Sequence, residues 1–461
     1  MIKRSLFCTL FTFTILAAEK PNVLFIAVDD LKPELGAYGN TQVKSPNIDK
    51  LASRSSVFTN AHCQWAVCGP SRASLMTGLY PESTGVMDLK TPMRSVNPDV
   101  LTLPQHFKNS GYFTAATGKI YDPRCVDGRT KDDAPSWSTP YKTLNYGKVK
   151  LKDGKHFAKA PELNDEDLTD GQILLNGLDL LEQAQNQDKP FFVAVGFKKP
   201  HLPFVAPKKY WDLYDRERLT LPSFLDKAQG ASDYGWHDSN ELRSYDGIPK
   251  KGPIAIELQK EAYHGYLACV SYIDALVGRL IQDLEKRNLA DNTIIVLWGD
   301  HGFHLGDHNM WGKHTNLEQA TRSPLIISLP KQKAQKSHTP AGLIDIFPTL
   351  CEAAGLEVPE VVQGTSLFPV INGEKDQHKN GAISFFKSKG AKGYSYRTKR
   401  YRYIEWSKGN KVEAIELYDY ENDPQEKINL ATQQESKELI RTLSQALRED
   451  GKGCQLMFKV K

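Results

Sequence analysis

The sequence is poor in cysteine, and its few cysteines lie far apart. Seven cysteines are spread over 461 residues, without a Cys-x-x-Cys pair and without the dense spacing of small disulfide-bonded domains. This scarcity excludes a disulfide-stapled scaffold and a metal site built on paired cysteines. Each cysteine must therefore be judged by its own surroundings, as a packing residue, half of a disulfide or a chemical group.

An excess of charge of one sign is also missing. Lysine and arginine together number 59 and aspartate and glutamate 55, so the chain is close to neutral and offers no electrostatic basis for binding nucleic acid. The sequence has no internal repeat and no low-complexity tract. Its 40% apolar and 25% charged residues are ordinary for a globular protein.

Long hydrophobic runs are absent except at the N-terminus. There, the basic pair Lys3-Arg4, an apolar run from Leu6 to Leu16 and the pair Ala17-Ala18 follow one another, which is the pattern of a secretory signal peptide. The run is too short for a comfortable transmembrane helix. We therefore expect residues 1–18 to be a signal peptide and the mature chain to be exported, periplasmic or secreted, with a retained N-terminal anchor as the alternative.

Apolar, β-branched segments alternate with helical patterns along the first three quarters of the chain. This alternation predicts an α/β fold with a large mixed, mostly parallel sheet flanked by helices. Two amphipathic helices are expected at residues 258–287 and about 167–185. The expected strands cover residues 22–28, 190–197, 292–298 and 324–329.

The character of the sequence changes after Gly364. Segments 381–386, 394–406 and 413–424 resemble antiparallel strands, and a helical pattern covers about 433–449. We therefore expect a catalytic domain over residues 19–365 and a smaller C-terminal α+β domain, built on an antiparallel sheet, over residues 366–461. Two polar stretches, 122–165 and 230–253, are expected to be long surface segments close to the site.

Acidic residues follow two of the expected core strands. Asp29 and Asp30 come directly after segment 22–28, and Asp300-His301 follow segment 292–298. Ligands bind beyond the carboxyl ends of strands in open α/β sheets, so these side chains are expected in one crevice. Close carboxylates repel one another, and a divalent cation would resolve the repulsion. Oxygen-rich ligands favour Ca²⁺ or Mg²⁺ over zinc. The alternative is that each acidic pair caps a helix or a turn.

A lone cysteine stands at the expected start of a helix in "WAVCGPSRASLMTG". Pro70 suits the first helical turn, which places Cys68 where free backbone N–H groups and the helix dipole favour an anion. Arg72 lies one turn further on and can fork to a carboxylate or an oxyanion. A buried packing cysteine would fit the composition equally well.

The segment "CGPSRASLMTG" resembles the signature of the sulfatase family, Cys-x-Pro-Ser-Arg followed by x-x-Leu-x-Thr-Gly. Further segments are similar to the family almost from end to end: "PNVLFIAVDDL", "SPNIDKLA", "TGKIY", "DHGFHLGDH", "RSPLI" and "ELYDYENDPQEKINLA". "KKPHLPFVAPKKYW" and the spacing to "WGKH" look most like the iduronate-2-sulfatase branch. The resemblance implies an alkaline-phosphatase-like fold and a sulfuric ester hydrolase.

The resemblance also implies an unusual nucleophile. In sulfatases the signature cysteine is oxidised to 3-oxoalanine (formylglycine) by a maturation enzyme, so Cys68 would become an aldehyde whose hydrate carries two hydroxyls. One hydroxyl attacks sulfur and forms a covalent sulfate ester as the alcohol leaves. Deprotonation of the second hydroxyl then expels sulfate and restores the aldehyde.

Other family roles can be carried over residue by residue. Arg72 would orient and charge-stabilise the formylglycine, Lys119 and Lys313 would hold the sulfate, and His201 would protonate the leaving alcohol. One Ca²⁺ per chain is implied. Its ligands would be Asp29, Asp30, Asp300, His301 and the hydroxyl made from Cys68.

One position departs from the family pattern. Relatives carry a histidine shortly after the first active-site lysine, where this chain has Asp122. That histidine is linked to deprotonation of the formylglycine hydrate. Asp122 could replace it as the base, His304 or His314 could move in, or turnover could be weaker. The charge of Asp122 beside a sulfate would need Lys119 or the metal to balance it.

Three functions compete. The first is an exported sulfatase acting on a sulfated sugar of a polysaccharide or oligosaccharide. The second keeps the nucleophile and hydrolyses phosphodiesters or phosphonate monoesters, as other members of the superfamily do. The third is a non-catalytic glycan-binding protein on a degenerate sulfatase scaffold. The intact signature, the acidic cluster and both lysines favour the first.

Overall fold

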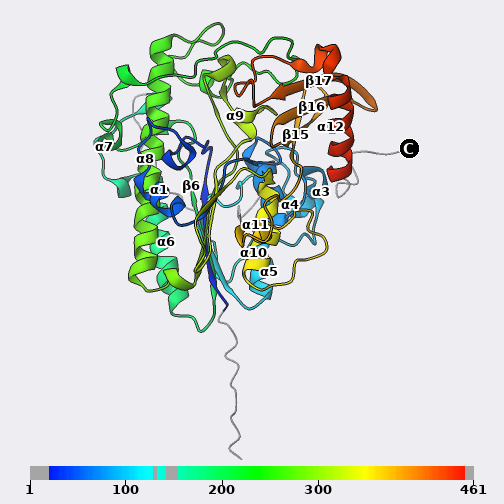
Figure 1. Ribbon diagram of the computed structural model, residues 1–461. Coiled ribbons are helices and arrows are strands. Elements are labelled where there is room, and N and C mark those ends of the chain that lie inside the picture. Colours follow the sequence, from blue (N-terminus) through cyan, green and yellow to red (C-terminus); the bar gives the residue numbers. More distant parts are fainter. Residues whose placement is uncertain (1–19, 128–131, 142–153, 452–461) are drawn as a thin grey trace, which may run out of the picture.

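A seven-stranded sheet forms the centre of the computed structural model, which describes residues 20–127, 132–141 and 154–451 (Figure 1). The expected signal peptide lies outside these residues, as do Cys8 and Cys454. The strand order is β12-β2-β11-β8-β1-β6-β4. The strands are β1 (Asn22–Val28), β2 (Ser56–Phe58), β4 (Phe113–Gly118), β6 (Phe191–Phe197), β8 (Thr293–Gly299), β11 (Leu325–Ser328) and β12 (Gln335–Ser337).

Strand β1 lies between β8 and β6 and is buried on both faces. Leu24, Ile26 and Val28 belong to the apolar core on one side of the sheet, and Phe25 and Ala27 belong to the core on the other side. Alternate side chains of a strand point to opposite faces, so a strand covered on both sides needs a continuous apolar run. The sequence of β1 meets this requirement.

The sheet is mixed, as expected, with one strand reversed. β1 pairs in parallel with β6 and β8, and β4 pairs in parallel with β6. β11 runs antiparallel to both β8 and β2. Its direction depends on the path of the chain through residues 300–324, which the apolar pattern of segment 324–329 does not encode.

Helices cover both faces of the sheet (Figure 1). The two expected long helices are present as α6 (Thr169–Gln185) and α8 (Ile256–Lys286), which pack with α1 (Pro46–Ala52) and α7 (Lys208–Trp211) on one face. The other face carries α2 (Cys68–Thr77), α4 (Met93–Val96), α5 (Leu103–Asn109), α10 (Ile346–Ala353) and α11 (Phe368–Ile371).

Short strands and helices complete this part of the described chain. Pairs form between β3 (Ala61–His62) and β13 (Ala341–Gly342), β5 (Ala158–Lys159) and β7 (Phe204–Val205), and β9 (His304–Leu305) and β10 (Trp311–Gly312). The helices α3 (Pro81–Thr84) and α9 (Glu318–Thr321) have one turn each.

The C-terminal part is a four-stranded antiparallel sheet covered by one helix. Its strands are β14 (Gly381–Ser388), β15 (Ala391–Thr398), β16 (Tyr401–Lys408) and β17 (Lys411–Asp419), and α12 (Lys437–Asp450) packs on it. The expected segment 394–406 is a hairpin that turns at Lys399-Arg400. The domain boundary at residue 365 stays a prediction.

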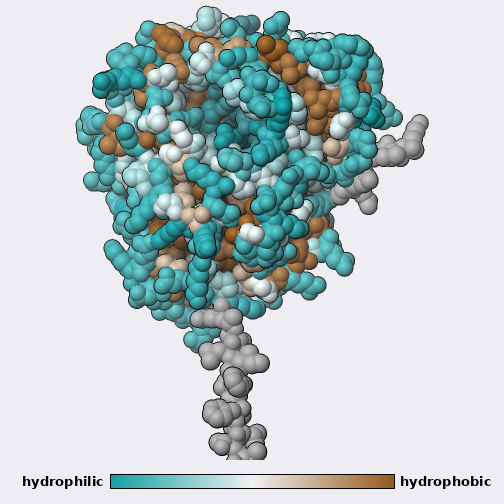
Figure 2. Space-filling model, in the orientation of Figure 1, coloured by the Kyte–Doolittle hydropathy of each residue, from teal (hydrophilic) through white to brown (hydrophobic). Residues whose placement is uncertain are grey.

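The surface view shows hydrophobic residues in separate patches among hydrophilic ones (Figure 2). Within the described residues, no helix combines the length and the apolar character that crossing a membrane requires. The five described cysteines are all buried and free of disulfides.

A buried ion-pair network joins the C-terminal sheet to α9. The guanidinium of Arg402 is fully buried and donates to Glu318 Oε2 at 2.5 Å and to the carbonyl oxygen of Asn316 at 2.8 Å. Its Nε lies 3.0 Å from Glu426 Oε1. Arg397 donates to the same Oε2 of Glu318 at 3.0 Å. Removing one member of such a network leaves a buried charge without its partner.

We predict that Arg402→Ala lowers the free energy of unfolding by about 3–5 kcal/mol, the usual cost of breaking a buried ion pair. Urea unfolding followed by tryptophan fluorescence measures the change. Arg441→Ala is the matched control because Arg441 is exposed and pairs with Glu438 on the surface of α12; its midpoint should equal that of the wild type. Equal shifts of the urea midpoint in the two variants would show that the network does not stabilise the packing of the C-terminal sheet on α9.

Candidate active site

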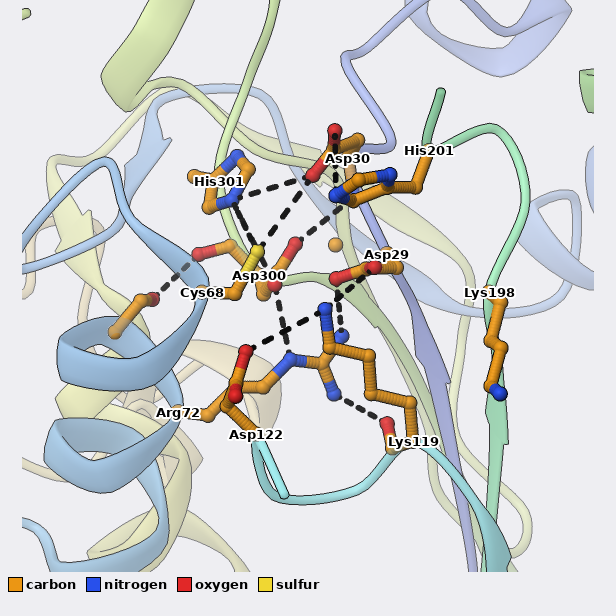
Figure 3. A network of polar contacts seen from close by, with 12 residues as sticks. Asp29, Asp30, Cys68, Arg72, Lys119, Asp122, Lys198, His201, Asp300 and His301 are labelled. Atoms are coloured by element: carbon orange, nitrogen blue, oxygen red, sulfur yellow. Dashed lines mark hydrogen bonds and ion pairs between the residues drawn. The ribbon is translucent and has the colours of Figure 1, made fainter. Parts of the chain in front are cut away.

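Four neighbouring parallel strands, β8, β1, β6 and β4, bring the expected site residues to one edge of the sheet. Each of these strands ends at the same side, so the residues that follow them meet. β1 is followed by Asp29 and Asp30, β8 by Asp300 and His301, β4 by Lys119 and Asp122, and β6 by His201. Figure 3 shows these side chains converging around Cys68.

Cys68 is the first residue of α2, as the sequence predicts, and its side chain lies at the centre of the cluster (Figure 3). The residue is 2% exposed. Its Sγ lies 3.3 Å from His301 Nε2 and donates to Asp30 Oδ1 at 3.8 Å. Burial, together with the charge of Asp29, raises the pKa of the thiol well above its ordinary value. Unmodified, this cysteine is a neutral thiol and a poor nucleophile.

Arg72 holds the acidic residues in place from one turn further along α2. Its fully buried guanidinium donates from Nε to Asp300 Oδ2 at 2.9 Å and from Nη2 to Asp29 Oδ1 at 3.1 Å. Nη1 donates to the carbonyl oxygen of Ile120 at 3.0 Å. The arginine therefore forks to carboxylates from two different strands and ties both to the helix that carries Cys68.

Two lysines pair with the remaining carboxylate oxygens. Lys119 Nζ lies 2.7 Å from Asp29 Oδ2, and Lys313 Nζ lies 2.9 and 2.8 Å from the two oxygens of Asp30. Burial opposes the charge of each lysine, but the neighbouring carboxylates raise the pKa of both above the ordinary value. Two buried cations, Arg72 and Lys313, and the partly buried Lys119 thus face three buried carboxylates, Asp29, Asp30 and Asp300.

These ion pairs bear on whether the carboxylates need a metal ion. Repulsion between the carboxylates does not by itself require a metal, because Arg72, Lys119 and Lys313 balance their charge. The donor geometry does fit one: ligand atoms of Asp30, Cys68, Asp300 and His301 lie within 4.8 Å of one another, and a second such set combines Asp29, Asp30, Cys68 and His201. A donor set rich in carboxylate oxygen suits a hard cation such as Ca²⁺.

His201 lies on the side of the cluster away from α2 (Figure 3). Its Nδ1 lies 2.7 Å from the carbonyl oxygen of Leu202, which only accepts, so Nδ1 carries the proton of this hydrogen bond. Nε2 is the nitrogen left to face the site, 3.4 Å from Glu241 Oε1 and 3.9 Å from Asp30 Oδ2.

Asp122 is tied to two cations. Arg124 donates to its two carboxylate oxygens, each at 2.8 Å, and Lys119 Nζ lies 3.7 Å away. Burial favours the protonated carboxyl, but the hydrogen bonds from Arg124 and the charge of Lys119 lower the pKa of Asp122 to about 2. A carboxylate with so low a pKa is a weak base near neutral pH. Arg124 and Lys119 supply the positive charge that balances Asp122. This geometry favours a role for Asp122 in positioning Lys119 rather than in accepting a proton.

The two histidines considered in its place are also constrained. His304 is fully buried, with Nδ1 on Asp307 and Nε2 3.1 Å from the hydroxyl of Thr315. Burial, with the nearby charge of Lys313, lowers the pKa of His314 to about 3.

Two site residues were not identified from the sequence. Glu241 lies in the polar segment 230–253, which was expected near the site, but nothing singled it out there. Arg124 follows Asp122 by two residues. It lies where the chain departs from the family pattern, so the resemblance assigned it no role. Both are charged residues in loops, where neither periodicity nor spacing marks a role.

Comparisons with known proteins agree with this geometry. The sulfatase family model matches residues 21–356, and a model described as N-sulphoglucosamine sulphohydrolase, C-terminal, matches residues 306–452. The chain is 35% identical to human iduronate 2-sulfatase over 382 residues, which cover 73% of this chain and 70% of that protein.

Solved structures show the same fold at lower identity. One, of a protein in complex with its substrate D-glucosamine-2-N,6-O-disulfate, has a TM-score of 0.76 at 24% identity and covers 95% of this chain and 98% of that one. Another, the phosphonate monoester hydrolase of Agrobacterium radiobacter, has a TM-score of 0.78 at 23% identity and covers 94% and 95%. At these identities the likeness concerns the fold alone.

We predict that Asp122→Asn keeps kcat for 4-nitrophenyl sulfate within about ten-fold of the wild type, since removal of a true general base costs about 10²–10⁴-fold. Steady-state kinetics at neutral pH measures the effect. A loss in that larger range, with an unchanged unfolding temperature, would instead identify Asp122 as the base.

Proposed function

The chain belongs to the sulfatase family and is a sulfuric ester hydrolase, and from this premise we propose that it is an exported enzyme that removes sulfate from a sugar of a polysaccharide or oligosaccharide. In this proposal Cys68 is converted to formylglycine by a maturation enzyme, and one Ca²⁺ is bound beside it.

The position of Cys68 carries the proposal. The side chain is buried at the point where carboxylates, lysines and an imidazole converge (Figure 3), yet burial and Asp29 keep its thiol protonated. A cysteine that only fills space in the core does not need ion pairs around it. A thiolate nucleophile would need surroundings that lower the pKa of the thiol, whereas these raise it. Conversion to a hydrated aldehyde supplies an oxygen nucleophile at the same position and accounts for both observations.

The residues around Cys68 are of the kinds that bind a sulfate ester and assist its cleavage. Lys119 and Lys313 present fixed positive charge beside the nucleophile, which favours an anionic group and the charge that gathers on it during transfer. The sulfur–oxygen bond to the sugar breaks, and its electron pair passes to the sugar oxygen. His201 presents Nε2 on the other side of the cluster, where the imidazolium form, which carries a proton on each ring nitrogen, would donate the proton that this oxygen takes up.

Asp29, Asp30, Asp300 and His301 would hold the calcium ion, together with the oxygen derived from Cys68. When bound, Ca²⁺ polarises sulfate oxygens and favours the ionised nucleophile. Arg72 donates to both Asp29 and Asp300 and so holds these two ligands together. With the ion on Asp29 and Asp30, Lys119 and Lys313 would be free to contact the substrate.

Export and the sugar substrate rest on separate observations. The basic pair, apolar run and paired alanines at the N-terminus support secretion. A sugar substrate is supported by the likeness to iduronate 2-sulfatase and by the fold shared with a protein that binds a sulfated glucosamine. Phosphonate hydrolysis has weaker support, because the phosphonate monoester hydrolase is similar in fold alone, whereas iduronate 2-sulfatase is also 35% identical in sequence.

We predict that the tryptic peptide Ser55–Arg72, from protein made in its native host, carries an aldehyde at Cys68. Mass spectrometry after alkylation should show Cys63 modified and Cys68 resistant, with the lower mass of formylglycine. Cys63 is the internal control because it lies in the same peptide and is also buried. Complete alkylation of both cysteines in active protein would refute the proposed nucleophile.

A further inference from the structure

Glu241 lies between His201 and Lys313 at the edge of the cluster. Its Oε1 lies 3.4 Å from His201 Nε2, and its Oε2 lies 3.5 Å from Lys313 Nζ. The side chain is 27% exposed, so it lies at the rim of the site, whereas Asp30, which contacts the same two residues, is fully buried.

The segment that carries Glu241 is anchored on both sides. The backbone N–H of Trp311, two residues before Lys313, donates to Ser239 Oγ at 2.8 Å. The guanidinium of Arg243 donates to the carbonyl oxygens of Asp238 and Gly252, each at 2.7 Å. Glu241 therefore lies in a loop that is held by a hydrogen bond to β10, the strand that directly precedes Lys313.

Asp30 lies nearer to Lys313, and Glu241 lies nearer to His201. Lys313 Nζ lies 2.8 Å from Asp30 and 3.5 Å from Glu241, and His201 Nε2 lies 3.9 Å from Asp30 and 3.4 Å from Glu241. Without Glu241, the carboxylates near His201 would be those of Asp29 and Asp30, both inside the cluster, and they would attract a protonated imidazole further into the site. With Glu241 in place, His201 is held at the rim, nearer the oxygen of a leaving sugar.

We propose that Glu241 is a positioning residue that holds His201 on the leaving-group side of the site. The inference rests on the proposed function, in which His201 Nε2 gives its proton to the departing oxygen while the sulfur–oxygen bond breaks toward that oxygen. A good leaving group departs as an anion without this proton. The need for Glu241 therefore grows as the leaving alcohol becomes more basic, and it is greatest for the unactivated alcohols of sugars.

The test compares two sulfate esters in the wild type and in Glu241→Gln. With phenyl sulfate, whose phenolate is a poor leaving group, kcat should fall about 10–100-fold, within or just below the range of general acid catalysis. With 4-nitrophenyl sulfate kcat should change less than about three-fold, and KM should change little for either ester. Glu241→Asp should recover part of the loss with phenyl sulfate.

Glu257→Gln is the matched control, since Glu257 is exposed in the first turn of α8, and it should leave both rates unchanged. Equal losses on both esters, or no loss on either, would overturn the inference. A lower KM with unchanged kcat would also overturn it, because Glu241 would then merely compete with sulfate for Lys313.

A crystal structure of Glu241→Ala tests the same point without turnover. The inference expects the imidazole of His201 to move toward Asp30 in this variant; an unchanged ring position would contradict it. If the wild type hydrolyses neither ester, nor any sulfated sugar, the proposed function fails, and the ring position still decides whether Glu241 places His201.

Discussion

The structure depends on the pairing of three cations, Arg72, Lys119 and Lys313, with three buried carboxylates at one edge of the central sheet. Arg72 is the most connected of them: it binds Asp300 and Asp29, which follow different strands, and it is part of the helix that begins at Cys68. The two lysines complete the balance. Because the charges compensate one another, the site can be buried without an unpaired ion, and a substrate sulfate meets fixed positive charge around the nucleophile.

The fold supplies this arrangement through strand direction and strand order. β8, β1, β6 and β4 are adjacent and parallel, so each contributes the residues that follow its carboxyl end. The buried cores on both faces fix the sheet and place α2 beside it. The network of Arg402, Glu318 and Glu426 then attaches the C-terminal sheet to the same framework. Rigid strand and helix ends, with anchored loops between them, hold the side chains in register.

Much of this was predictable from the sequence. The apolar segments gave the core strands, and the acidic residues directly after residues 28 and 299 pointed to one crevice. Cys68 lies at the start of its helix, as Pro70 indicated. The reversed direction of β11 was not predictable, because an apolar run has no polarity. The ion pairs of Lys119 and Lys313 with the carboxylates, and the positions of Glu241 and Arg124, depend on loops whose paths are set by tertiary contacts.

We propose that the acidic cluster around Cys68 binds a hard metal ion next to the nucleophile. Calorimetric titration of chelator-treated protein with Ca²⁺ tests it most directly, with Asp300→Asn as the comparison. The account predicts one Ca²⁺ per chain for the wild type, a rise in unfolding temperature on binding, and loss of both effects in the variant. Absence of calcium binding to the wild type, or equal binding to Asp300→Asn, would contradict it.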